Sequence, residues 1–225
     1  MAVRTTIRVL LHMRKSSLKV PALRSPLRYT RPQDRSSMAH IHWTPLRVEL
    51  AASALLVAAA AAWSSVRVLG LASAAEPSVG TVCAGVGAGV ALAATLPLVT
   101  APWARRLFLL RGLRRAWDSL ESGIGPGLGV VEILVLALGS AVSEEAFFRG
   151  AVQREFGVAA ASVLFGLLHP LGAAYIVWAT VVGAGLGALA IASGGLVAPI
   201  AAHGTYNLLA LAYLRRRSVR PDTRS

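Results

Sequence analysis

Cysteine, lysine and acidic residues are scarce in this chain of 225 residues. Its one cysteine, Cys83, excludes a disulfide framework. Ten Asp and Glu stand against 23 Lys and Arg, which gives a net charge of +13. Only 15% of the residues are charged and 55% are hydrophobic, whereas soluble domains are about 25% charged. This composition argues against an ordinary soluble globular protein.

The positive charge is confined to three short segments. Residues 1–47 carry a net charge of +9, residues 104–115 carry +5 and residues 215–225 carry +4, so the rest of the chain is net negative. A nucleic-acid-binding protein would carry such charge on a folded face with polar surroundings. We therefore expect no nucleic-acid partner, and we interpret the chain as an integral membrane protein whose basic segments flank its spans.

Long stretches without charge predict the membrane spans. Residues 77–104 and 157–214 contain no Lys, Arg, Asp or Glu, and about 20 apolar residues cross a bilayer. Pro and Gly residues break these stretches into separate hydrophobic helices. The predicted fold class is all-α, a polytopic transmembrane helical bundle of about six spans, at residues 48–70, 79–103, 124–147, 158–169, 173–193 and 196–214.

Pairs of glycines one helical turn apart occur in two of these spans. They are Gly85-x-x-x-Gly89 and Gly183-x-x-x-Gly187. Small residues at this spacing let transmembrane helices approach closely. A general richness in alanine and glycine explains either pair equally well.

The chain divides into four parts. Residues 1–47 form a basic arm that we expect to be disordered, and Met38 is an alternative start. The arm lacks an apolar run of 7–15 residues, which argues against a cleaved signal peptide. Residues 48–123 are predicted to hold two transmembrane helices and a basic amphipathic loop. Residues 124–214 form the membrane core that carries the polar motifs, and residues 215–225 form a basic tail.

Three known intramembrane protease chemistries lack their residues in this sequence. There is no His-Glu-x-x-His zinc motif. The three aspartates, Asp34, Asp118 and Asp222, lie outside the predicted spans, which excludes an aspartyl dyad. No span carries a Gly-x-Ser-Gly motif, which excludes a rhomboid-type serine nucleophile. The glycine-rich residues 123–129 lack Gly-x-Gly-x-x-Gly spacing and therefore do not indicate a nucleotide site.

The end of the third predicted span carries three charges in the motif Ser-Glu-Glu-Ala-Phe-Phe-Arg-Gly. Glu145 and Arg149 are four residues apart, so they share a helical face and can form an ion pair. Glu144 is rotated away by about 100° and must face a different environment, which suits a general acid or base. A helix-end charge at the membrane interface is the simpler alternative. Glu132 is ambiguous: a partner for a buried Arg and a group that supports the site from behind are both open, and a functional role is the less favoured interpretation.

Two further motifs place histidines in hydrophobic helices. Phe165 precedes His169 by four residues, and His203 precedes Asn207 by four. A single buried histidine is more often structural, but both histidines outside the arm lie in predicted spans, which favours a joint site. Two His and one Glu are the protein ligands of many catalytic zinc sites. The same residues can also activate a water molecule without metal.

The order and spacing of the three motifs resemble those of the CPBP family. This family contains the CAAX prenyl protease 2 (Rce1-like) and bacteriocin-processing (Abi) intramembrane proteases. The resemblance covers residues from about 124 to 214. It is carried by Glu-Glu-x-x-x-Arg (Glu144, Glu145, Arg149), Phe-x-x-x-His (Phe165, His169) and His-x-x-x-Asn (His203, Asn207).

The resemblance implies an all-helical membrane endopeptidase with its site in a cavity between helices. Glu144 and His169 would activate the attacking water. His203 and Asn207 would stabilise the oxyanion or help to hold a metal. Such donors act where negative charge develops on the substrate.

The remaining motif residues would support this site. Glu145 with Arg149 would orient the site or bind an end of the substrate, and Phe165 would have a supporting role. If the enzyme uses a divalent metal such as zinc, its ligands would be Glu144, His169 and His203. Both a metal-dependent and a metal-free mechanism are compatible with these residues.

The expected partners are membrane lipid and a peptide or protein substrate, such as a C-terminal or leader peptide. The expected location is the cytoplasmic (inner) membrane of a prokaryote. Two alternatives stay open: a membrane scaffold or immunity protein without proteolysis, and a small transporter with Glu and His as a proton relay.

Membrane topology poses a problem for this interpretation. With six spans, the excess of Lys and Arg places all three basic segments in the cytoplasm and the Glu-Glu motif near the far side of its span. The resemblance implies a site open to the cytosol. Either the number of spans differs by one, or the cavity is deep.

Overall fold

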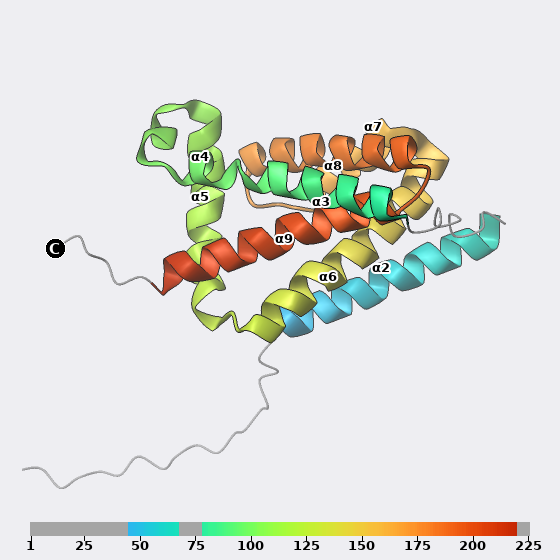
Figure 1. The fold of residues 1–225 in the computed structure, drawn as a ribbon, viewed down its shortest axis with the longest axis horizontal. Coiled ribbons are helices and arrows are strands. Elements are labelled where there is room, and N and C mark those ends of the chain that lie inside the picture. The colour runs from blue at the N-terminus through green and yellow to red at the C-terminus, as the bar shows by residue number, and fades with distance from the viewer. Residues whose placement is uncertain (1–44, 68–77, 220–225) are drawn as a thin grey trace, which may run out of the picture. The chain divides into compact units, whose positions relative to one another are not determined.

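The computed structural model describes residues 45–67 and 78–219, which lie within one compact unit, and every regular element in these ranges is helical (Figure 1). The predicted all-α class is therefore confirmed. Residues 1–44, with the alternative start at Met38, lie outside the described residues. In chain order the elements are α2 (Pro45–Arg67), α3 (Val79–Ala93), α4 (Leu96–Thr100), η1 (Pro102–Arg106), α5 (Phe108–Gly123), η2 (Gly125–Gly127), α6 (Val130–Phe147), η3 (Phe148–Val152), α7 (Gln153–Leu167), α8 (Ala173–Ser193) and α9 (Val197–Ser218).

Three helical stretches among the described residues are long and apolar enough to cross a membrane. They are Pro45–Val66, Val79–Thr100 and Ala173–Ser193. The other three predicted spans correspond to α6, α7 and α9, which carry the polar motifs. α6 contains three glutamates and α7 has only 15 residues. All six predicted spans are therefore largely helical where the structure describes them, and the three that carry the candidate site residues fall outside this apolar group.

Two of the predicted spans begin later or are interrupted in the structure. The third begins at Val130 rather than 124, because Gly125–Gly127 forms a 3-10 turn and Gly129 is extended, with φ −83° and ψ 177°. The second is interrupted after Ala93 and resumes at Leu96. Pro97 lies in the first turn of α4, a position that tolerates its missing N–H.

The basic segments are more helical than the sequence predicted. Most of the stretch 104–121, interpreted as a loop, is the amphipathic helix α5. The tail predicted from residue 215 begins inside α9, which continues to Ser218. At the predicted break over 154–157, only Gly157 departs from helical geometry, with φ +81°, a value that glycine adopts without strain.

Contacts between side chains show the directions of α2, α6 and α9 relative to one another. The hydroxyls of Ser53 and Ser143 are 3.0 Å apart. The rings of Trp63 and Phe156 pack edge to face at 5.8 Å. Residue numbers therefore rise together along α2 and along α6 with the start of α7, so α2 is parallel to α6.

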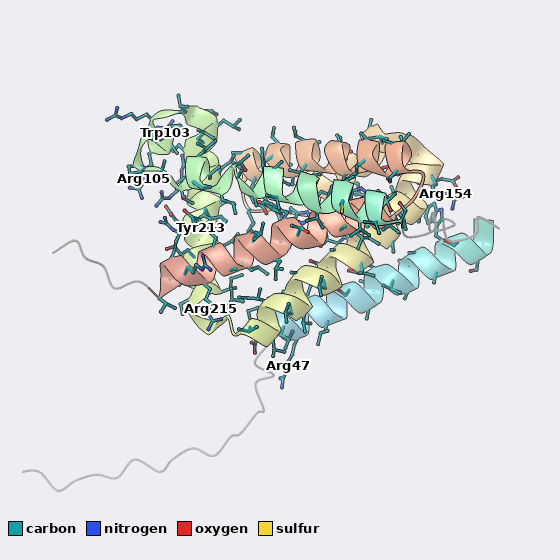
Figure 2. The ribbon with its side chains drawn as sticks, in the orientation of Figure 1. Arg47, Trp103, Arg105, Arg154, Tyr213 and Arg215 are labelled. Atoms are coloured by element: carbon teal, nitrogen blue, oxygen red, sulfur yellow. The ribbon has the colours of Figure 1, made fainter. Side chains whose placement is uncertain are left out.

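Helix α9 runs antiparallel to α6. His203 contacts Glu145 at one end of the pair, and Gly125, just before α6, packs against Ser218 at the other. The start of α2, the start of α6 and the end of α9 therefore lie at the same end of the helices. We call this the basic end. In Figure 2 the labelled Arg47, Arg105 and Arg215 lie toward it, while Arg154 lies at the opposite end.

The glycine pair in α3 is a close-packing contact with α9. A Cβ atom added at Gly85 would fall on the backbone oxygen of Ala198, and one at Gly89 would lie 2.5 Å from the backbone oxygen of Ala202. Backbone atoms cannot move aside as a side-chain end can. This pair therefore has the packing role that its spacing predicts.

We expect Gly89→Val to destabilise the protein by about 1–3 kcal/mol, because the added atoms overpack the contact between α3 and α9. Gly87 on the same helix is the matched control, since a Cβ there meets nothing within 4 Å. Thermal unfolding of both variants in one detergent measures the difference. Equal losses for Gly89→Val and Gly87→Val would contradict this packing.

Candidate functional site

Glu145 is at the centre of a buried polar cluster. Its side chain is 0% exposed, and its Oε1 accepts a hydrogen bond from Arg149 Nη1 at 2.9 Å. The predicted ion pair is therefore confirmed. The same Oε1 is 2.8 Å from His203 Nδ1. Glu145 thus joins α6 to α9 and cannot bind a substrate end without a rearrangement of this cluster.

A π-helical turn places Arg149 in this cluster. Between α6 and α7, residues Phe148–Val152 form η3, and π-helical turns are frequent at functional sites. Arg149 donates from Nη2 to the backbone oxygen of Gly183 on α8 at 2.8 Å. Its guanidinium also lies 4.9 Å from the ring centre of Phe165. Arg149 therefore connects the end of α6 to α7 and α8.

Glu144 points into a cavity instead of into the Glu145 cluster. Its Oε2 is 3.8 Å from His169 Nε2. Among the described residues this oxygen has no hydrogen-bond partner. The two adjacent glutamates therefore occupy different environments, as the helical geometry predicts, and Glu144 Oε2 is a buried acceptor whose hydrogen-bonding capacity no described residue uses.

His169 follows the end of α7 and is held by Phe165. Its Nδ1 is 2.7 Å from the backbone oxygen of Phe165, so this nitrogen carries the proton and donates it. The imidazole also packs on the Phe165 ring, with 4.5 Å between ring centres. Both contacts fix the ring so that Nε2 faces Glu144. Phe165 therefore has a definite structural role in the site.

His203 and Asn207 face the same cavity from α9. Asn207 Nδ2 donates to Ser140 Oγ at 3.0 Å, and Ser140 Oγ donates to the backbone oxygen of Leu136 at 2.6 Å. One Asn207 N–H is thereby held, and the second is available to a ligand. His203 is held at Nδ1 by Glu145.

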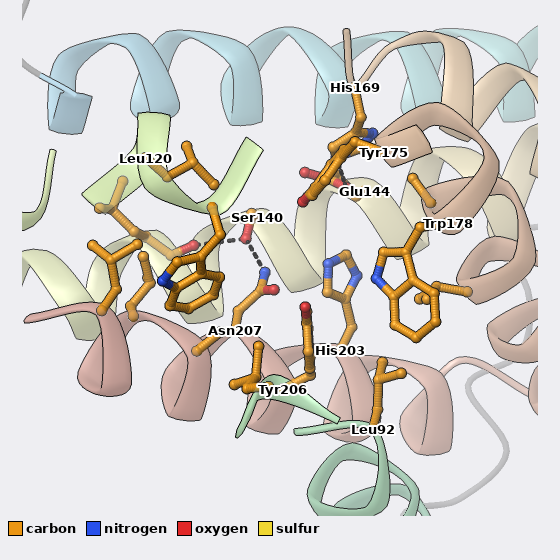
Figure 3. Close-up of a pocket in the computed structure, with 18 of the residues that line it drawn as sticks. Leu92, Leu120, Ser140, Glu144, His169, Tyr175, Trp178, His203, Tyr206 and Asn207 are labelled. Carbon is orange, nitrogen blue, oxygen red and sulfur yellow. Dashed lines mark hydrogen bonds and ion pairs between the residues drawn. The ribbon is translucent and has the colours of Figure 1, made fainter. Parts of the chain in front are cut away.

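These four residues line one cavity of about 550 Å³. Figure 3 shows Glu144, His169, His203 and Asn207 converging on it from α6, the residues after α7, and α9. Apart from Glu49, its other described lining residues are neutral, and no Lys or Arg is among them. The cavity therefore combines a small polar site with a long apolar wall, as peptide-binding and small-molecule sites commonly do.

Several lining residues were missed by sequence reasoning. Ser140 holds Asn207, while the aromatic residues Tyr175, Trp178 and Tyr206 enclose the polar site. Glu49 of α2 also lines the cavity and accepts a hydrogen bond from Ser53 at 2.7 Å. Glu49 had a signal, because it is a carboxylate inside a predicted span. The aromatic residues had none beyond their place near His169 and His203.

Glu132 lies apart from the site. It is in the first turn of α6, and its carboxylate lies against Gly129 at the start of the same helix. It is absent from the described lining of the cavity. An acidic residue at this position is stabilised by the dipole of its own helix. Neither role expected for Glu132 from the sequence matches this placement.

The predicted metal ligands are not arranged as a ligand group in the structure. No three His, Cys, Asp or Glu residues in the described part of the chain are placed to hold one ion. Glu144, His169 and His203 share the cavity, and the bond from His203 Nδ1 to Glu145 is compatible with a metal at Nε2 of the same ring. A catalytic zinc site has three protein ligands converging on the metal. The use of a divalent metal stays a prediction.

Residues 126–209 match the protein family described as type II CAAX prenyl endopeptidase Rce1-like. The matched segment runs from the turn before α6 into α9 and includes all seven predicted site residues. No curated protein and no solved structure matches the chain. Residues 126–209 of this integral membrane protein are therefore similar to the Rce1-like family of CAAX-type intramembrane proteases.

Proposed function

We propose that this chain is an intramembrane endopeptidase in which Glu144 and His169 activate a water molecule. The main support for this proposal is that four polar residues from three segments line one largely apolar cavity. They are Glu144, His169, His203 and Asn207. Glu144 Oε2 and His169 Nε2 are 3.8 Å apart. One water molecule can hydrogen-bond to both at about 2.8 Å each.

The first step is attack by this water on the peptide carbonyl carbon. A C–O bond forms, Glu144 takes a proton from the water, and the carbonyl oxygen becomes negative. With its Nδ1 proton directed at Glu145, a doubly protonated His203 donates from Nε2 to this oxygen. The free N–H of Asn207 supplies a second donor. Such preorganised donors are commonly the largest contribution to catalysis.

The second step breaks the C–N bond. Glu144 returns its proton to the leaving nitrogen, which departs as an amine, and the other product is a carboxylic acid. Glu145 serves as the counter-charge for His203 throughout, because it is fully buried and has contact with that ring. The reaction consumes one water and needs no further reactant.

The cavity suggests how substrate reaches the site. It extends from Glu144 to Pro45, Trp117 and Leu214, and Pro45 and Leu214 lie at the basic end. Basic segments mark the cytoplasmic side, so we place the entrance on that side of a prokaryotic inner membrane. A deep cavity then reconciles a cytosolic entrance with the position of Glu144 along α6. The apolar wall suits the apolar residues of a C-terminal or leader peptide.

The test is cleavage by the full chain in lipid nanodiscs. Prenylated CAAX-like peptides, leader peptides and an apolar peptide library are incubated with the wild type, His169→Gln and His203→Gln, with and without a chelator. We expect cleavage by the wild type and loss in both variants. Absence of cleavage of every substrate by folded wild type would favour a scaffold or immunity role. Cleavage unaffected in both variants would contradict the mechanism.

Ser140→Ala should reduce kcat by roughly 10- to 100-fold, because Asn207 loses the bond that aims its amide at the oxyanion. KM should change little. Ser162→Ala is the matched control, since Ser162 is also buried and donates to a carbonyl of its own helix at 2.6 Å. Steady-state kinetics of both variants measures the difference. Equal kcat values for the two would remove Ser140 from the site.

A further inference from the structure

The segment Trp103–Arg115 has an outer surface that combines exposed cations with exposed large apolar side chains. It comprises most of η1 and the first half of α5 and carries five arginines and no acid. Four large apolar side chains of the segment are exposed, namely Trp103, Leu107, Phe108 and Leu109. Phe108 is the most exposed of the four, at 81%. Neither water nor the membrane interior suits such a mixture, but the headgroup layer between them does.

Three of the five arginines have no acidic partner in the part of the chain that the structure describes. Arg105 and Arg114 both contact Asp118, at 3.6 Å and 2.6 Å. Within the described ranges no carboxylate forms an ion pair with Arg106, Arg111 or Arg115, and all three are exposed. The guanidinium of Arg111 lies 5.7 Å from the Phe108 ring centre, so a cation and an aromatic ring are adjacent on this surface.

The position of α5 matches the plane of a membrane surface. Figure 1 shows α5 crossing the direction of α8 and α9 beside their ends. Its Gly112 packs on Ala174 at the start of α8, and its Glu121 pairs with Arg217 at the end of α9 at 3.0 Å. Both contacts are with helix ends, so α5 lies across the bundle at the basic end and does not pass through it.

We infer that the segment Trp103–Arg115 lies in the headgroup layer and binds anionic phospholipid through Arg106, Arg111 and Arg115. The apolar side chains reach the upper acyl region, and the guanidiniums meet phosphate oxygens. The ligand is anionic because three uncompensated cations gather beside an apolar surface. This inference stands without the proposed protease activity, since it rests on no residue of the site.

The same helix separates lipid from the cavity. Leu113, Trp117 and Leu120 on its inner side line the cavity. The outer side presents Arg111 and Arg115. Lipid bound at the outer side therefore holds in place one wall of the cavity, at the end where we place its entrance.

The test uses native mass spectrometry of the full chain in a mild detergent, with phosphatidylglycerol and phosphatidylcholine of the same acyl chains in competition. We expect the wild type to retain phosphatidylglycerol preferentially. Each arginine near an anionic surface contributes roughly fivefold, so R111Q/R115Q should weaken retention by about 25-fold. R111K/R115K should keep most of it, which separates lost charge from misfolding.

The matched control is R105Q/R154Q, which removes the same charge. Arg105 is paired with Asp118, and Arg154 lies at the opposite end (Figure 2). We expect this variant to stay within about threefold of the wild type. No preference for phosphatidylglycerol in the wild type, or equal loss in both double variants, would overturn the inference. A phosphatidylglycerol preference abolished only by R111Q/R115Q would support it.

The depth of the segment gives an independent readout. In vesicles of phosphatidylglycerol brominated near the headgroup, Trp103 fluorescence should be quenched. The difference between the wild type and Trp103→Phe isolates this residue from the other tryptophans. Identical quenching of the two proteins would place Trp103 outside the lipid and would also overturn the inference.

Discussion

Glu144→Gln is expected to lower kcat/KM by at least about 100-fold, the usual contribution of a general base. The amide keeps the shape of the side chain, but it cannot take a proton from the water. Glu144 has no hydrogen-bond partner for Oε2 among the described residues, so the substitution breaks no observed bond there. Stability should therefore change much less than activity, and the loss should appear in kcat.

Glu132→Gln is the matched control for this measurement. Glu132 is on the same helix, carries the same charge and lies outside the described cavity lining. We expect kcat/KM within about threefold of the wild type, since only a helix-dipole interaction changes. Cleavage by Glu144→Gln at the rate of Glu132→Gln would remove Glu144 from the reaction.

Local spacing allowed most of the polar site to be predicted from the sequence. The four-residue separations of Glu145 from Arg149 and of His203 from Asn207 imply a shared helical face, and both pairs lie as expected. Few other ionisable residues occur in the hydrophobic stretches, and this scarcity narrowed the choice of candidate site residues further. Charges buried in a membrane need a partner or a function, so few candidates had to be considered.

Contacts between distant helices could not be predicted. The hydrogen bond from His203 to Glu145 joins residues 58 positions apart, and the one between Ser53 and Ser143 joins residues 90 apart. Such contacts depend on how helices pack, and periodicity within one helix carries no information about its neighbour. Glu49 reaches the cavity in this way from α2, outside the segment that matches the Rce1-like family.

The role of α5 also depended on tertiary structure. The five-arginine stretch 104–115, of which α5 carries three arginines, was interpreted as a loop because its charge separates two apolar spans. The structure shows a helix whose buried side chains, Leu113 and Trp117, pack toward the cavity. Burial of one apolar stripe stabilises such a helix, but the surface that buries it comes from other parts of the chain.

Glu145→Leu is expected to lower the free energy of unfolding by about 3–5 kcal/mol and to abolish cleavage, because it leaves a buried charge without its partner. The Arg149 side chain is only 1% exposed, so solvent cannot replace the lost carboxylate. Asp118→Asn is the matched control. It breaks a pair of the same spacing in α5, but Asp118 is 40% exposed, and exposed pairs contribute about 0–1 kcal/mol. Chemical unfolding in one detergent compares the two variants.

The double variant E145L/R149M separates the two consequences of losing Glu145. Replacing both partners of a buried ion pair with apolar side chains is often neutral, so stability should recover much of the loss. Cleavage should stay abolished, because His203 still lacks the carboxylate that accepts its Nδ1 proton and balances its charge in the oxyanion step. Recovery of cleavage together with stability would mean that Glu145 serves only to neutralise Arg149. Failure to recover stability would mean that the contact of Glu145 with His203, or the bond from Arg149 to Gly183, contributes more to stability than the ion pair.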